Sequence, residues 1–112
     1  MEVDGKALSQ SVCTLRYLAI KLGYMPQDPM AAYDADRAAT TVDECVGPHF
    51  FMAFIAPEHD PEVCAKRLEM HGNVLRQLSD QLGDKKYFGG GDKPSYGDFH
   101  VFAWLASISM NP

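Results

Sequence analysis

The 112-residue sequence has no long hydrophobic run and no excess of positive charge. No apolar stretch approaches the roughly 18 residues that a membrane-spanning helix needs. The N-terminus shows neither the basic nor the apolar region of a signal peptide. The net charge of -5 disfavours nucleic acid or an anionic membrane as the main partner, because both attract a basic surface. We therefore expect a cytoplasmic globular protein that binds neither.

Cysteine is scarce, and its spacing excludes two further classes of site. Cys13, Cys45 and Cys64 are odd in number and far apart, which favours reduced thiols over a disulfide framework. Neither the cysteines nor the histidines have the spacing of metal ligands, so no metal site is predicted. Cys13 lies near a predicted helix start, and we interpret it as a small packing residue.

What is present predicts a mainly helical domain. The apolar share of 46% and the charged share of 22% are those of an ordinary globular protein of one domain's length. Asp4-Gly5 predicts a β-hairpin, but strands this short are not stable alone. Apolar periodicity then predicts four helices: one that Ser11 caps and Gly23 ends, one over about 30–56, one over 61–82 and one over 95–110.

Ser95-Tyr96-Gly97-Asp98 has the form of a capping box. The Ser95 hydroxyl is expected to accept a hydrogen bond from the Asp98 backbone N–H, and the Asp98 carboxylate to accept one from the Ser95 N–H. Such boxes open many helices, so we assign this one a structural role. The helix that follows is apolar nearly all round, which predicts a central, buried position.

Gln10-Ser11, directly before the first helix, suggests chemistry as well as capping. A helix N-terminus offers free N–H groups and a positive dipole end, which together suit a carboxylate. Ser11 adds a hydroxyl, and Gln10 adds an amide that both donates and accepts. The alternative is that Ser11 only caps the helix and Gln10 is an ordinary surface residue.

Three segments, in order, resemble the glutathione transferases: VDGKALSQSVCTLRYLAIKLGY, DPMAAYDADRAATTVDE and KKYFGGGDKPSYGDFHVF. The resemblance is strongest to the tyrosine-type group that includes the sigma class. It implies that residues 1–24 are the end of a thioredoxin-like domain, 25–29 a linker, and 30–112 an incomplete all-α C-terminal helical domain. The hairpin at the N-terminus would then belong to a sheet.

The resemblance implies glutathione as co-substrate and assigns residues to it. Gln10 and Ser11 would hold the γ-glutamyl carboxylate and the neighbouring backbone. Glu44 would reach the glutathione amine bound by the partner subunit of a homodimer, with Asp43 as the alternative if the register slips by one. The alternative is that Asp43 and Glu44 have no binding role and lie on a solvent-exposed face of the helix.

The same resemblance implies a pocket for a hydrophobic electrophile and a dimer contact. The pocket residues would be His49, Phe50, Phe51 and Phe54, although an aromatic cluster at this spacing is also typical of plain core. Arg16 and Asp36 would either pair across the dimer interface or be exposed.

The chemistry of the family depends on a Tyr, Ser or Cys near the start of the first strand, which stabilises the glutathione thiolate. The resemblance places that residue before Met1. We therefore expect a full-length parent that conjugates glutathione to electrophiles or isomerises a substrate with it, and expect these 112 residues alone to be inactive. The alternative is a non-catalytic transferase-like helical module, as in lens crystallin-like relatives or translation factors.

Overall fold

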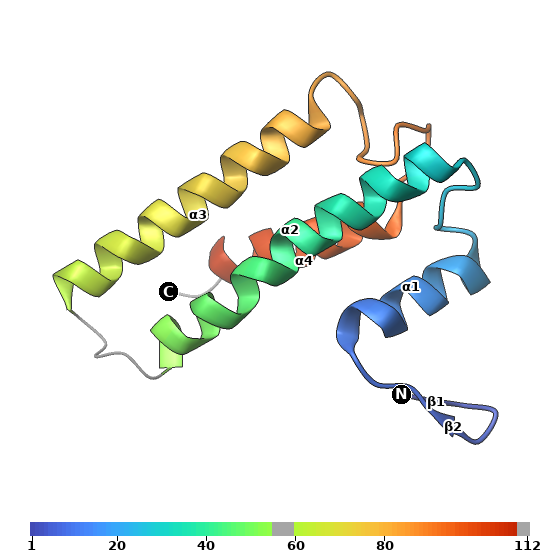
Figure 1. Ribbon diagram of the computed structural model, residues 1–112, viewed down its shortest axis with the longest axis horizontal. Helices are drawn as coiled ribbons and strands as arrows, with labels where there is room; N and C mark the ends of the chain where they lie inside the picture. Colours follow the sequence, from blue (N-terminus) through green and yellow to red (C-terminus); the bar gives the residue numbers. More distant parts are fainter. Residues whose placement is uncertain (55–59, 110–112) are drawn as a thin grey trace.

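A short hairpin followed by helices accounts for the described chain (Figure 1). The computed structural model describes residues 1–54 and 60–109, with the side chains of all of these except 46–54. The elements are β1 (Glu2–Val3), β2 (Lys6–Ala7), α1 (Ser11–Leu22), α2 (Pro29–Phe54), α3 (Pro61–Leu82) and α4 (Tyr96–Ser109). The prediction of a mainly α fold with a small β-hairpin is confirmed.

The hairpin turns at Asp4-Gly5, as predicted. Both residues have positive φ, 51° and 76°, which is the requirement of a tight two-residue turn that matches the strand twist. Strands β1 and β2 pair antiparallel, and the Leu8 N–H donates to the Met1 carbonyl at 2.8 Å to extend the ladder. The hairpin lies beside the start of α1 and away from the other helices (Figure 1).

Helix α2 is the centre of the helical part. It packs against α4 on one side and α3 on another, while α1 contacts α2 and α4 at one end. The buried core between α2, α3 and α4 includes Val42, Leu78, Val101 and Trp104. A second, smaller core joins α1 to the bundle and consists of Ala19, Ala35, Ala39 and Tyr96.

Side-chain and glycine signals set the helix ends. The Asp28 carboxylate accepts from the Ala31 N–H at 2.9 Å and caps α2, which begins at Pro29. Asp60 caps α3 by accepting from two backbone N–H groups, with Pro61 as the first helical residue. Helix α2 continues through Gly47 and Pro48 to Phe54, and its predicted end at Ala56 lies outside the described residues.

The prediction that α4 is buried all round is wrong for the described residues. Val101 and Trp104 are buried against the bundle, but Phe99 is 41% exposed and Phe102 is 71% exposed. The helices that contact α4 leave the side chains of Phe99 and Phe102 partly open to solvent. The apolar composition of α4 therefore did not predict which face of this helix is buried.

Candidate functional site

Gln10 and Ser11 stand at the open N-terminal end of α1. The prediction that Ser11 caps this helix is wrong: Gln10 occupies the cap position, Ser11 is the first helical residue, and no side chain caps the end. The first backbone N–H groups of α1 are therefore left for a partner from outside the helix. Both side chains are exposed, so a hydroxyl and an amide flank these N–H groups.

The backbone of Gln10 is held in an unusual conformation, with φ 66° and ψ 116°. A side chain other than glycine rarely adopts this geometry, which costs on the order of 1–3 kcal/mol and concentrates at binding sites. The Gln10 carbonyl nevertheless accepts the first helical bond, from the Thr14 N–H at 2.9 Å. The strained residue is therefore the one that joins the hairpin segment to the helix.

An Arg–Asp–Tyr cluster fixes α1 to the bundle. The Arg16 guanidinium donates from Nε to Asp36 Oδ1 at 3.1 Å, and its Nη2 lies 2.6 Å from Asp36 Oδ2. The hydroxyl of Tyr96, a residue that is 1% exposed, donates to the same Asp36 Oδ1. The Arg16–Asp36 pair therefore lies within one chain, with Arg16 exposed and Asp36 half-buried.

This cluster alters the acid–base properties of its members. Burial, followed by the hydrogen bond to Asp36, raises the pKa of Tyr96 to about 12. The hydrogen bond to Asp36 is also the main reason that the pKa of Arg16 is raised. A phenol with a raised pKa stays neutral at physiological pH, so Tyr96 acts as a hydrogen-bond donor that orients Asp36.

Alkaline pH is expected to weaken the fold through Tyr96. Because the native state holds this proton more tightly than the unfolded state, its contribution is complete below about pH 10 and is lost as the pH rises towards 12. A two-unit shift corresponds to about 2.7 kcal/mol. Urea unfolding at several pH values should show this loss in the wild-type protein. In Tyr96→Phe the free energy of unfolding should fall less steeply with rising pH. Tyr33→Phe, at an exposed tyrosine of α2, is the control and should keep the wild-type slope.

The Asp98 carboxylate organises the start of α4. Its Oδ2 accepts from the Ser95 backbone N–H at 2.7 Å and from the Ser95 hydroxyl at 2.6 Å. The Ser95 carbonyl, rather than its hydroxyl, accepts from the Asp98 N–H at 3.1 Å. This differs from the expected box in one bond, because the short Asp side chain brings its carboxylate within reach of the hydroxyl.

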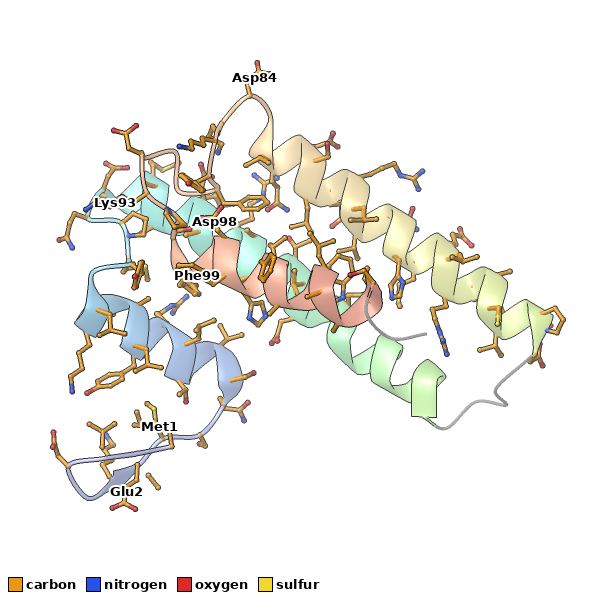
Figure 2. All side chains as sticks on the ribbon, turned by 180° about the vertical axis from the view of Figure 1, so that it is seen from behind. Met1, Glu2, Asp84, Lys93, Asp98 and Phe99 are labelled. Carbon is orange, nitrogen blue, oxygen red and sulfur yellow. The ribbon has the colours of Figure 1, made fainter. Side chains whose placement is uncertain are left out.

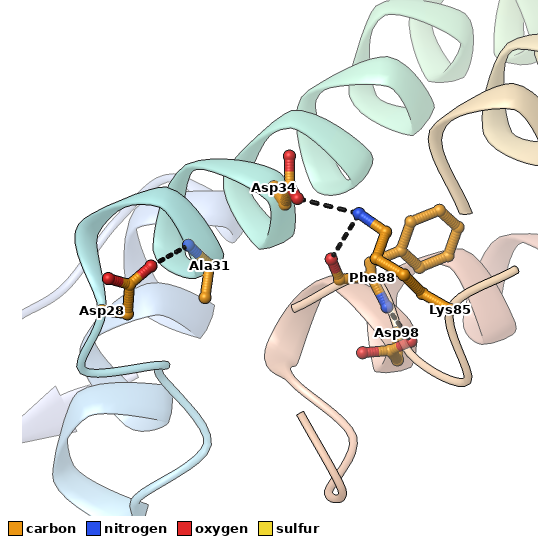
Figure 3. A network of polar contacts seen from close by, with 6 residues as sticks. All are labelled: Asp28, Ala31, Asp34, Lys85, Phe88 and Asp98. Carbon is orange, nitrogen blue, oxygen red and sulfur yellow. Dashed lines mark hydrogen bonds and ion pairs between the residues drawn. The ribbon is translucent and has the colours of Figure 1, made fainter. Parts of the chain in front are cut away.

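Asp98 also holds the loop that leads into α4 (Figure 3). Its Oδ1 accepts from the Phe88 N–H at 3.0 Å. In the same loop, Lys85 Nζ lies 2.8 Å from Asp34 Oδ2 of α2 and 3.5 Å from the Phe88 carbonyl. Figure 2 shows Asp84 at the far end of this loop and Asp98 where α4 begins. The loop is thus tied to both helices by charged side chains.

Asp43 and Glu44 point to different neighbours. Asp43 Oδ1 lies 3.8 Å from His100 Nε2 on α4. Glu44 is exposed and lines a groove of about 420 Å3 between α2 and α3, together with Lys66 and Asn73. Adjacent residues of an α-helix are about 100° apart around the axis, which explains the separation.

The remaining predictions concern the hydrophobic pocket, metal ligands, membrane spans and thiols. The side chains of His49, Phe50, Phe51 and Phe54 lie outside the described residues, so their role in a hydrophobic pocket stays a prediction. Among the described residues there is no group of three potential metal ligands, and no helix is long and apolar enough to cross a membrane. Of the thiols, Cys45 is buried, and burial raises its pKa.

Sequence reasoning missed three long-range contacts of α4 with its neighbours. Tyr96 and Gly97 lie inside the predicted capping box, yet the contacts of Tyr96 with Asp36 and of Gly97 with α2 are long-range. The approach of His100 to Asp43 was missed for the same reason. The one available signal was Gly97 itself, because a glycine inside a helix is typical of a close backbone approach.

Comparison with known proteins identifies relatives of this chain. Residues 72–112 match the model of the glutathione S-transferase C-terminal domain. The chain is 32% identical over 105 residues to hematopoietic prostaglandin D synthase from Gallus gallus, an alignment that covers 89% of the chain and 50% of that protein. The chain thus spans half the length of this relative. No solved structure matches this chain with comparable significance. These matches do not favour the alternative of a non-catalytic helical module.

Proposed function

Because the chain is a relative of the glutathione S-transferases, we propose that it supplies the γ-glutamyl half of a glutathione site. In this proposal Gln10 and Ser11 bind the γ-glutamyl carboxylate and its neighbouring backbone. The observation that carries it is the uncapped N-terminus of α1, where free N–H groups, a hydroxyl and an amide lie together. The chemistry of the whole protein would be glutathione conjugation to electrophiles, or isomerisation with glutathione.

The α1 end is well suited to this task because it is fixed in place. The Arg16–Asp36–Tyr96 cluster ties the middle of α1 to α2 and α4, so the helix N-terminus has a defined direction relative to the bundle. The conformation of Gln10 is set before a ligand arrives, so binding does not have to order it. A carboxylate would also gain from the positive end of the helix dipole.

We also propose that residues 1–24 belong to the thioredoxin-like part of the parent and 30–112 to its helical domain. Glu44 would bind the glutathione amine of a partner subunit in a homodimer, and His49, Phe51 and Phe54 would contribute to the pocket of the hydrophobic co-substrate. The exposed carboxylate of Glu44 supports the first assignment, since a ligand ammonium can reach it.

We further propose that these 112 residues bind glutathione without activating its sulfur. Thiolate stabilisation needs a donor directed at the sulfur. Tyr96 already donates to Asp36 and is buried, and Tyr24 packs edge-to-face on Phe99 with ring centroids 5.0 Å apart. Under this proposal the rate of glutathione conjugation to an aromatic electrophile should equal the rate in buffer, and a faster rate would overturn it.

Retention on immobilised glutathione tests the proposed site. The double variant Gln10→Ala, Ser11→Ala should bind at least about tenfold more weakly than the wild-type protein, because it loses hydrogen bonds to a charged group. The matched control is Gln27→Ala, Ser79→Ala, which removes the same two residue types from exposed positions away from α1. Equal retention of the wild type and the Gln10/Ser11 double variant would overturn the assignment.

A further inference from the structure

Helix α3 carries a second row of apolar and small residues outside its buried face. The buried face, with Val74 and Leu78, packs into the larger core. The second row, which we call the outer stripe, consists of Ala65, Leu68, Gly72, Leu75, Ser79 and Leu82. Its members alternate by three and four residues, which is the spacing of a coiled-coil seam. Leu68 is 73% exposed and Leu75 is 42% exposed, so the described part of the chain leaves the middle of the stripe open.

The outer stripe borders an open groove of about 370 Å3 between α3 and α4. Leu75 and Leu82 line this groove on the α3 side, and Phe102, which is 71% exposed, lines it on the α4 side. A Cβ atom on Gly72 would meet nothing within 4 Å, so the surface beside this residue is open as well. Helix α3 lies at the outer edge of the described structure (Figure 1), which leaves room for a further helix along this face.

The order of large and small residues in the outer stripe fits a second, antiparallel copy of α3. With a two-fold axis near the middle of the helix, Leu75 lies opposite Gly72 of the partner subunit. In the same register, Leu68 lies opposite Ser79 of the partner subunit. Each of these leucines then enters a space left by a small residue, as knobs-into-holes packing requires. The two-fold axis repeats every such contact.

Two exposed charges along one edge of the outer stripe fit the same arrangement. Glu69 and Arg76 lie seven residues apart, and neither belongs to an ion pair within the described ranges of the chain. Arg76 donates only to the side chain of the neighbouring Asn73. An antiparallel pair brings Glu69 close to Arg76 of the partner subunit, and the reverse, whereas a parallel pair would place equal charges side by side.

We propose that the outer stripe is the interface of a homodimer in which α3 pairs antiparallel with α3 of a second copy. The interface is complementary to itself in both size and charge, which specifies a closed two-fold dimer rather than an open-ended assembly. This inference goes beyond the proposed function and does not rest on it. Glu44 lines the groove between α3 and α2, a different groove from the one that the outer stripe borders.

Sedimentation equilibrium of the full chain over a wide range of concentrations tests the apolar part of the interface. The wild-type mass should rise with concentration and level off at twice that of one chain. Leu68→Glu, Leu75→Glu should raise the dissociation constant at least about a hundredfold, because each buried charge would occur twice. The matched control is Ile20→Glu, Met30→Glu, at exposed apolar positions of α1 and α2, and should keep the wild-type dissociation constant. A monomeric wild type, aggregates without a dimer limit, or equal effects of both double variants would overturn the proposal.

A charge exchange tests the antiparallel direction and uses exposed side chains, so the fold is not at stake. Glu69→Arg should raise the dissociation constant about tenfold, because two pairs of like charges would then face each other across the interface. Adding Arg76→Glu to this variant should restore the wild-type value. A double variant that dimerises no better than Glu69→Arg alone would overturn the antiparallel pairing. The measurement requires no glutathione, so a failure of the proposed glutathione site leaves its outcome unchanged.

Discussion

Gly97→Ala is expected to lower the free energy of unfolding by about 3 kcal/mol or more, because α4 and α2 touch at this position. A Cβ atom on Gly97 would lie 2.4 Å from the Ala35 carbonyl oxygen and 3.1 Å from the Ala35 Cα. These are backbone atoms of Ala35, a fully buried residue of α2, so neither can rotate away. The helices would have to separate, which would open the smaller core that also contains Tyr96 and Ala39.

The control for this prediction is the same substitution in α3. A Cβ atom on Gly72 would meet nothing within 4 Å. Since alanine favours a helix over glycine by about 1 kcal/mol, Gly72→Ala should leave stability unchanged or raise it slightly. Urea unfolding of both variants measures the difference. A Gly97→Ala protein as stable as the wild type would show that the α2–α4 approach is looser than the structure has it.

Asp98→Ala should cost about 3 kcal/mol of unfolding free energy. The substitution removes the acceptor of three hydrogen bonds at once, from the Ser95 N–H, the Ser95 hydroxyl and the Phe88 N–H. Ser95 and Phe88 are buried, so water cannot readily replace the carboxylate. Each buried donor left without a partner costs about 1–3 kcal/mol, and the start of α4 also loses a negative charge that favours its dipole.

Asp84→Ala provides the matched comparison, because Asp84 lies in the same loop (Figure 2) and is exposed. Its effect should stay within about 0.5 kcal/mol. Hydrogen exchange adds a local measurement: the amides of Phe88 and Ser95 should lose protection in Asp98→Ala and keep it in Asp84→Ala. Unchanged protection of both amides in Asp98→Ala would contradict the role of the carboxylate as the acceptor that holds the loop to α4.

The turns and most helix ends of this protein were predictable from short stretches of sequence. Asp4-Gly5 gave the hairpin, the helix predicted over 61–82 begins at Pro61, and Gly23 ends α1. The physical reason is that a cap or turn is decided by groups within about four residues of one another. The cap of α1 was the exception. There the backbone geometry of Gln10, rather than the hydroxyl of Ser11, sets the boundary.

The candidate site was predictable only as residue types at a helix start. Gln10 and Ser11 were found because a helix N-terminus favours anions wherever it occurs. The local pattern of α2 did not separate Asp43 from Glu44, since both acids suit an exposed helix face equally well. Their difference appears only when α4 places His100 against Asp43 and α3 forms a groove beside Glu44.

The sequence by itself determined the mainly α class, the order of the elements and several of the residues at which they end. Only the tertiary structure decided which surfaces meet. The Arg16–Asp36 pair joins residues 20 positions apart, and the Tyr96–Asp36 bond joins residues 60 positions apart. Such contacts depend on which helix faces are buried together and how closely two backbones approach. At Gly97 that approach needs the absence of a single side-chain carbon, and the sequence of the helix does not tell which backbone comes close there.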